Sequence, residues 1–288
     1  MDTQPIPTLT GVGELGACCE IHIFLGPVAT EETVNAKDFR DVVAQYKEAV
    51  KLWNATRREA LGKRDQDVMH GEMKAPVLTL VFRDGDGEQP LTVCQSARYV
   101  YCNSVDKMQA LCHEDAEFFR SQGFTVIREK IEATAHGIRG VPQNIAEASK
   151  YPQLYFEFHI KVQKRDDRAE PQPIAPEEET QLRALANALS RDLRGPIPLS
   201  YNREKNESNV DNGGCQRFLN VRFYELGLAE IKPKLEAIYA AIESSGSFRR
   251  VKTISEYVWH DTNKALDHGW IEYSPAELVA LQERLCRE

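Results

Sequence analysis

The predicted order of helices and strands repeats in the two halves of the chain, and this repeat limits the possible folds more than any other feature. In the first half, alternating and helical patterns predict a strand over 19–25, a helix over 36–61, strands within 77–94 and over 97–103, a helix over 105–121 and a strand over 124–136. In the second half they predict a strand over 154–162, a helix over 177–193, strands over 197–202 and 215–227, a helix over 230–244 and a strand over 248–260. Each half therefore reads β-α-β-β-α-β.

Individual residues repeat as well as elements. The segment EIHI at 20–23 matches EFHI at 157–160, and a constant offset of 124 pairs Glu132 with Glu256 and His136 with His260. We therefore predict a tandem duplication. The β-α-β-β-α-β order is typical of a ferredoxin-like sandwich, in which both helices cover one face of an antiparallel sheet. The expected fold is α+β, with two ferredoxin-like lobes over 17–140 and 152–273 and a terminal helix over 274–288.

Composition sets limits on the class of partner. The chain has 288 residues and a formal net charge of −8, which argues against bulk nucleic-acid binding because that needs clustered cations. No apolar run approaches the roughly 20 residues that span a bilayer, and the first residues lack a secretory signal. Seven cysteines without a C-x-x-C pair are typical of reduced thiols. We expect a soluble, cytoplasmic protein with a small-molecule partner and no membrane association, while the oligomeric state stays open.

Glutamate and histidine alternate on the strands that the repeat pairs. Glu157 and His159 share one face of their strand, and Glu256 and His260, four apart, share one face of the last strand. The first strand of a ferredoxin-like sheet lies beside the last. We therefore expect Glu157, His159, Glu256 and His260 to meet on the open sheet face of the C-terminal lobe or in the cleft between lobes. Their counterparts in the N-terminal lobe are Glu20, His22, Glu132 and His136.

This set of residue types favours an enzyme that acts on a small, anionic molecule. In a metal-dependent version, His159, His260 and Glu157 ligate a divalent transition metal that activates water or binds a chelating substrate, as in a hydrolase or lyase. In a metal-free version, His159 is the base and His260 the acid. The predicted substrate-binding residues are Arg222, Asn202, Lys161 and Asp261.

Other interpretations fit the same pattern. Glu-x-His on a strand also forms solvated faces and cross-strand ion pairs, and two open faces could pack together as an interface. A non-catalytic module that binds a small molecule or a protein is therefore the competing class. Phosphate-loop and nucleophile-elbow motifs are absent from the sequence.

Two families show partial resemblances. One His-bearing strand in each half, HIF at 22–24 and HIK at 159–161, resembles the two-histidine phosphoesterases. That resemblance implies a bilobal enzyme that processes phosphodiesters, although Phe24 and Lys161 stand where that family has Thr or Ser. The duplication with His and Glu on open sheets is also similar to the vicinal oxygen chelate proteins, whose βαβββ modules have one helix fewer per half.

Overall fold

The computed structural model of the protein describes residues 17–30, 36–61, 69–84, 87–102, 104–135, 140–165, 171–193, 197–202 and 214–263. The described strands are β1 (Ala17–Thr30), β2 (Met69–His70), β3 (Val77–Asp84), β4 (Gly87–Cys102), β5 (Thr125–Thr134), β6 (Tyr155–Lys164), β7 (Leu199–Asn202), β8 (Gln216–Tyr224) and β9 (Phe248–Asp261). The described helices are α1 (Ala36–Leu61), α2 (Val105–Ser121), α3 (Ile145–Ala148), α4 (Pro176–Leu193) and α6 (Leu228–Ser244).

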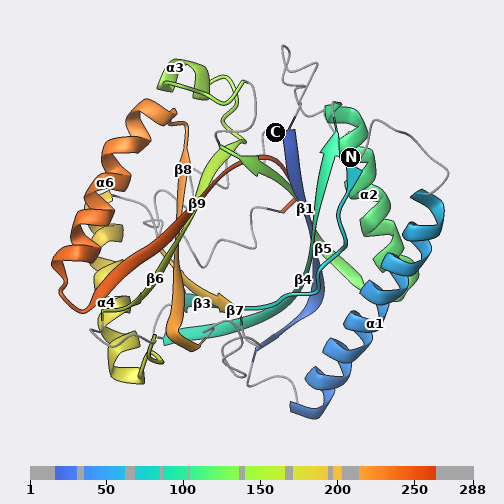
Figure 1. The fold of residues 1–288 in the computed structure, drawn as a ribbon, viewed down its shortest axis with the longest axis horizontal. Helices are drawn as coiled ribbons and strands as arrows, with labels where there is room; N and C mark the ends of the chain where they lie inside the picture. Colours follow the sequence, from blue (N-terminus) through green and yellow to red (C-terminus); the bar gives the residue numbers. More distant parts are fainter. Residues whose placement is uncertain are drawn as a thin grey trace.

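Within these residues, nine strands form one antiparallel sheet in the order β1-β5-β9-β6-β8-β7-β3-β4-β2. β1 also pairs with β4, so the sheet closes on itself, and β2 extends only from β4. The remaining eight strands form a closed barrel, which Figure 1 shows as a ring.

The helices lie outside the barrel. In Figure 1, α1 and α2 flank β1, β4 and β5 on one side, and α4 and α6 flank β6, β8 and β9 on the other. α2 begins at the N-cap Ser104, whose side chain accepts from the backbone N–H of Lys107. Its buried residues Met108, Cys112, Ala116 and Phe119 recur at helical spacing and pack in the apolar core between helix and sheet. None of the described helices combines the length and apolar character needed to cross a membrane.

The predicted fold of two ferredoxin-like lobes with open sheets is wrong. β1 does lie beside β5, and β6 beside β9, as expected within each half. However, β5 also pairs with β9, and β3 pairs with β7, so the two half-sheets join edge to edge. An unpaired sheet edge exposes backbone donors and acceptors, and mutual pairing satisfies them. The face predicted to be open thus becomes the barrel interior.

The division of the chain into two domains stays a prediction. The first predicted segment, 17–140, contributes β1 to β5, and the second, 152–273, contributes β6 to β9. The predicted helix over 274–288 lies outside the described residues.

A β-bulge changes the direction of side chains near the end of β9. Glu132 on β5 pairs with Val258, but the next pair joins Ile131 to His260, so Trp259 is the extra residue. Beyond the bulge, alternation is shifted by one position. His260 therefore follows Ile131 to the outer face of the barrel, and Asp261 pairs with Lys130 on the inner face.

Candidate functional site

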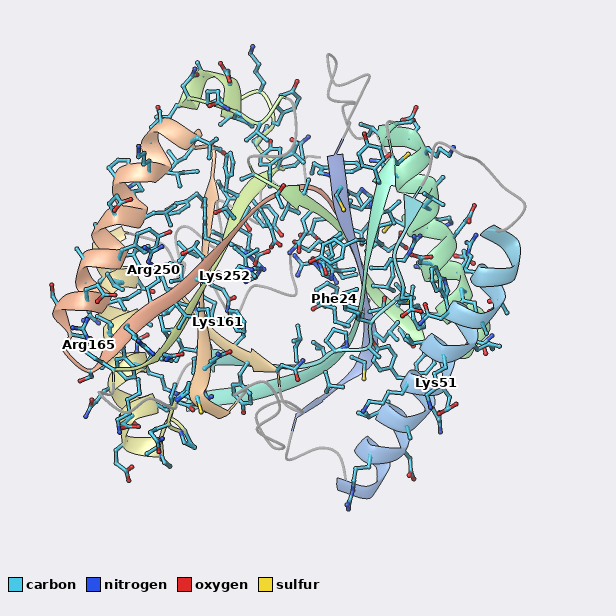
Figure 2. The ribbon with its side chains drawn as sticks, in the orientation of Figure 1. Phe24, Lys51, Lys161, Arg165, Arg250 and Lys252 are labelled. Atoms are coloured by element: carbon cyan, nitrogen blue, oxygen red, sulfur yellow. The ribbon has the colours of Figure 1, made fainter. Side chains whose placement is uncertain are left out.

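The barrel encloses a cavity of about 640 Å³, which we call the chamber. Its wall is formed by inward-facing side chains of both halves of the chain. In Figure 2, Phe24 lies on one side of the barrel, and Lys161 and Lys252 lie on the opposite side. Lys161 lines the chamber, whereas Lys252 does not. The apolar part of the lining comprises Phe24, Ala75, Pro76, Leu78, Ala97, Phe218 and Ile254. The charged part comprises Glu20, Lys74, Arg128, Lys130, Glu132, Glu157, Lys161, Arg222 and Glu256.

A buried network of ion pairs runs along the part of the chamber wall that β5, β6 and β8 form. Lys130 is in contact with the carboxylates of both Glu132 and Glu157. Arg222 donates from Nε to Oε1 of Glu157 over 2.7 Å. Burial opposes the charge on Glu157, but Arg222 and Lys130 outweigh it and hold its pKa below the usual value. Burial also opposes the charge on Lys130, yet Glu132 and Glu157 raise its pKa. The network is therefore ionised at neutral pH.

His22 on β1 is held at both ring nitrogens. Its Nε2 lies 2.7 Å from Oε1 of Glu132, and its Nδ1 lies 2.6 Å from the side-chain nitrogen of Gln95. Burial opposes protonation of His22, but the charge of Glu132 raises its pKa overall. His22 is thus fixed in place by β4 and β5.

His159 on β6 is held in the same way by different partners. Its Nδ1 donates to Oδ1 of Asn220 over 2.6 Å, and Asn220 is oriented by its own donation to Ser200 Oγ over 2.9 Å. Its Nε2 lies 3.1 Å from Oε2 of Glu256. Burial opposes protonation, but the hydrogen bond that the ring donates to Glu256 and the charge of Glu157 raise the pKa of His159 to about 9. At neutral pH the chamber therefore contains an imidazolium.

The pKa of Glu256 is raised, whereas that of Glu157 is lowered. Burial and then the charge of Glu132 raise the pKa of Glu256, although His159 acts against both. A carboxyl with a raised pKa beside an imidazolium is a pair through which a proton can move.

A second buried group lies where β5, β6 and β9 meet. Arg128 donates from Nε to Oδ1 of Asp261 over 2.8 Å, and Tyr155 donates to Oδ2 of Asp261 over 2.8 Å. Burial opposes the charge on Asp261, but Arg128 and the hydrogen bond from Tyr155 lower its pKa overall. Asp261 is engaged by the protein itself and does not line the chamber.

The structure brings together only part of the predicted site. Glu157, His159 and Glu256 line the chamber together with their predicted counterparts Glu20, His22 and Glu132. The predicted substrate-binding residues Arg222, Asn202 and Lys161 also line it. His136 lies outside the described residues.

His260 does not join this group, because the bulge in β9 turns it to the outer face. The predicted metal set of His159, His260 and Glu157 is therefore not assembled, and His260 cannot be the acid that acts with His159. A ring nitrogen of His260 instead lies within 4.8 Å of Cys112 Sγ and a carboxylate oxygen of Glu129.

Two sets of possible metal ligands do face the chamber: Glu20, His22 and Glu132, and Glu132, His159 and Glu256. Glu132 belongs to both, and the ligand atoms of each set lie within 4.8 Å of one another. The ammonium of Lys130 and the protonated ring of His159 already neutralise these carboxylates. A divalent ion would have to compete with both cations.

Sequence reasoning missed Lys130, Arg128, Gln95 and Asn220. The signal for two of them was present, because Arg128, Lys130 and Glu132 alternate along one strand and so share a face. Asn220 alternates with Arg222 along its strand, which predicts the same face for both, whereas Gln95 carries no such pattern. Only the register of β4 and β8 identifies Gln95 and Asn220 as partners of the histidines.

Comparisons with known proteins give no family assignment. No protein-family profile matches the sequence, and no curated protein matches it. Among solved structures, the chain is similar to a heme-binding protein from Thermus thermophilus. The two are 11% identical, the alignment covers 85% of this chain and 92% of that chain, and the TM-score is 0.27. At this level of likeness the neighbour does not bear on the function of this chain.

Proposed function

We propose that the protein binds a small, anionic organic molecule inside the chamber. The observation that carries this proposal is the sign of the chamber's charge. Among the described lining residues, five are Lys or Arg and four are Glu. Asp261 on the same inner face offsets the charge of Arg128, so the proton of His159 makes the interior positive. The whole chain has a net charge of −8, so the interior is cationic within an acidic protein.

The size and lining of the chamber support a compact, partly apolar ligand. Its volume of about 640 Å³ falls within the roughly 300–1,000 Å³ of typical small-molecule pockets. Phe218 packs edge-on to His159, with ring centroids 6.4 Å apart, and places an aromatic ring beside the polar wall. An anion with an aromatic or aliphatic body therefore matches the lining better than an inorganic ion does.

We expect the anionic group of the ligand to lie near Lys161. Lys161 lines the chamber and lies directly opposite Lys252 in the pairing of β6 with β9. Two lysine side chains therefore extend from neighbouring positions on adjacent strands. Like charges directly opposite one another destabilise a sheet. An anion that lies between them would relieve this repulsion.

An enzymatic role stays a prediction, and in such a role we expect His159 and Glu256 to transfer the proton. His159 carries a proton at neutral pH and lies 3.1 Å from the carboxylate of Glu256. The pair lines the same cavity as Lys161, so a bound anion and an acid would be close together.

Anilinonaphthalene sulfonate, an aromatic anion, is a suitable probe of this proposal. We expect saturable one-to-one binding by fluorescence titration. The double variant Lys161→Glu/Lys252→Glu should bind at least about tenfold more weakly, because two attractive charges become repulsive. Lys51→Glu is the matched control, since Lys51 lies on α1 outside the barrel with its side chain 71% exposed.

Near-ultraviolet circular dichroism establishes that each variant keeps its packed core during the titration. Equal affinity of the double variant and the control would refute the proposed position of the anion, and lack of saturable binding would refute the chamber as a binding site. Displacement of the probe by phosphate esters, dicarboxylates and aromatic carboxylates then ranks the ligand classes.

A further inference from the structure

Three side chains of metal-ligating type meet outside the barrel, beneath α2. They are Cys112 on α2, Glu129 on β5 and His260 on β9, and their ligand atoms lie within 4.8 Å of one another. The exposed fractions are 0%, 8% and 9%, respectively, so the group is largely buried. Cys112 and His260 have no part in the chamber.

The bulge in β9 is what places His260 in this group. Without the extra residue Trp259, alternation from Glu256 through Val258 would point His260 into the chamber. Bulges recur where a strand must redirect a functional side chain. Here the bulge directs an imidazole toward a thiol and a carboxylate.

His260 has an unused ring nitrogen in this buried position. Its Nδ1 is shielded from solvent and makes no hydrogen bond within the described structure. A buried polar atom without a partner is costly, and native proteins retain few of them. The unpaired nitrogen therefore indicates that something beyond the chain's own described groups binds here.

We propose that Cys112, Glu129 and His260 bind a zinc ion or a similar divalent transition metal. Thiolate, imidazole and carboxylate are the ligand types of protein zinc sites, and a thiolate excludes the harder calcium and magnesium ions. On binding, Cys112 loses its thiol proton to solvent, and its sulfur forms the bond to the metal. Glu129 has one oxygen available, because Oε1 accepts from Arg120 over 3.0 Å.

The fourth position of the tetrahedron is open to water or to His113. Nδ1 of His113 lies 3.7 Å from Oε2 of Glu129, and its side chain is 64% exposed. His113 follows Cys112 on α2 and is a ligand-type group with an exposed side chain near the site.

The site would fasten the two halves of the barrel together. β5 and β9 form one of the two seams at which the first half of the chain pairs with the second, and β3 and β7 form the other. An ion bound here links α2 and β5 of the first half to β9 of the second. Because the ligands are assembled only in the folded state, metal binding becomes folding free energy.

The test is metal titration of the full chain after chelator treatment and dialysis. We expect uptake of one Zn²⁺ per chain and a rise in the thermal midpoint of unfolding. Co²⁺ should give a thiolate-to-metal charge-transfer absorption band. His260→Ala and Cys112→Ser should each weaken binding on the order of 100-fold and abolish that rise in the thermal midpoint.

His159→Ala separates this site from the chamber, since it removes a possible ligand from the interior and leaves the outer group intact. Uptake that survives His260→Ala but is lost in His159→Ala would overturn the proposal, as would no stoichiometric uptake by the wild type. If Cys112→Ser does not fold, Glu129→Gln takes its place, because it removes a ligand charge from a strand residue with little change of shape.

Discussion

Lys130→Met is expected to lower the free energy of unfolding by about 3–5 kcal/mol, the typical effect of removing one partner from a buried ion pair. The Lys130 side chain is 6% exposed and contacts Glu132 and Glu157, whose side chains are 4% and 1% exposed. Methionine fills similar space without a charge. Glu157 would then keep only Arg222 as an ion-pair partner, and Glu132 would keep only its contact with the ring of His22. Chemical denaturation followed by circular dichroism measures the loss.

Two further variants test whether the loss of stability comes from the buried charge of Lys130. Lys51→Met removes an ammonium that pairs with Glu48 over 2.6 Å at a site where both side chains are about 70% exposed, so it should change stability by less than about 1 kcal/mol. Lys130→Met/Glu157→Gln should recover part of the loss, because one unpaired charge is removed together with the cation. Equal losses in Lys130→Met and Lys51→Met would contradict the claim that Lys130 neutralises the chamber.

Local periodicity was enough to predict which residues lie on each face of β1 and β6. Glu20, His22, Glu157 and His159 share the inner face of the barrel, as their alternation indicated. The closure of the barrel was not predictable in this way. It depends on pairing between β5 and β9 and between β3 and β7, which are contacts between distant segments that leave no periodic signal in either strand.

The error at His260 has a specific physical cause. A spacing of four residues places two side chains on one face only in a regular strand, and the extra residue Trp259 breaks that rule between Glu256 and His260. No glycine or proline marks the bulge in the sequence. The same extra residue brings Asp261 to the inner face, where it pairs with Arg128.

The duplicated pattern also proved unequal between the halves. Lys130 stands beside His22 on the neighbouring strand, but Ile254 occupies the corresponding place beside His159. The ring of His159 therefore lies beside the carboxylate of Glu256, and no cation stands directly opposite His159 on β9. Its protonation therefore depends mainly on Glu256 and Glu157.

His159→Gln should reveal this protonation as a pH-dependent loss of stability. Folding raises the pKa of His159 from 6.5 to about 9, so the folded state binds the proton more tightly than the unfolded state does. The stabilisation is fully present below pH 6.5 and disappears as the pH rises through 9. Because the side chain is 25% exposed, we expect a difference of about 2 kcal/mol between wild type and variant at low pH.

Denaturant titrations of both proteins below pH 6.5, between 6.5 and 9, and above 9 measure this difference. Glutamine retains a side-chain amide that can donate to Asn220 or Glu256, so the loss of charge is the main change. In a Glu256→Gln background the difference should shrink, because the hydrogen-bonding carboxylate that holds the proton is absent. A difference that stays constant across this pH range would mean that His159 is neutral in the folded protein. The chamber would then lack the positive charge that its ring contributes to anion binding.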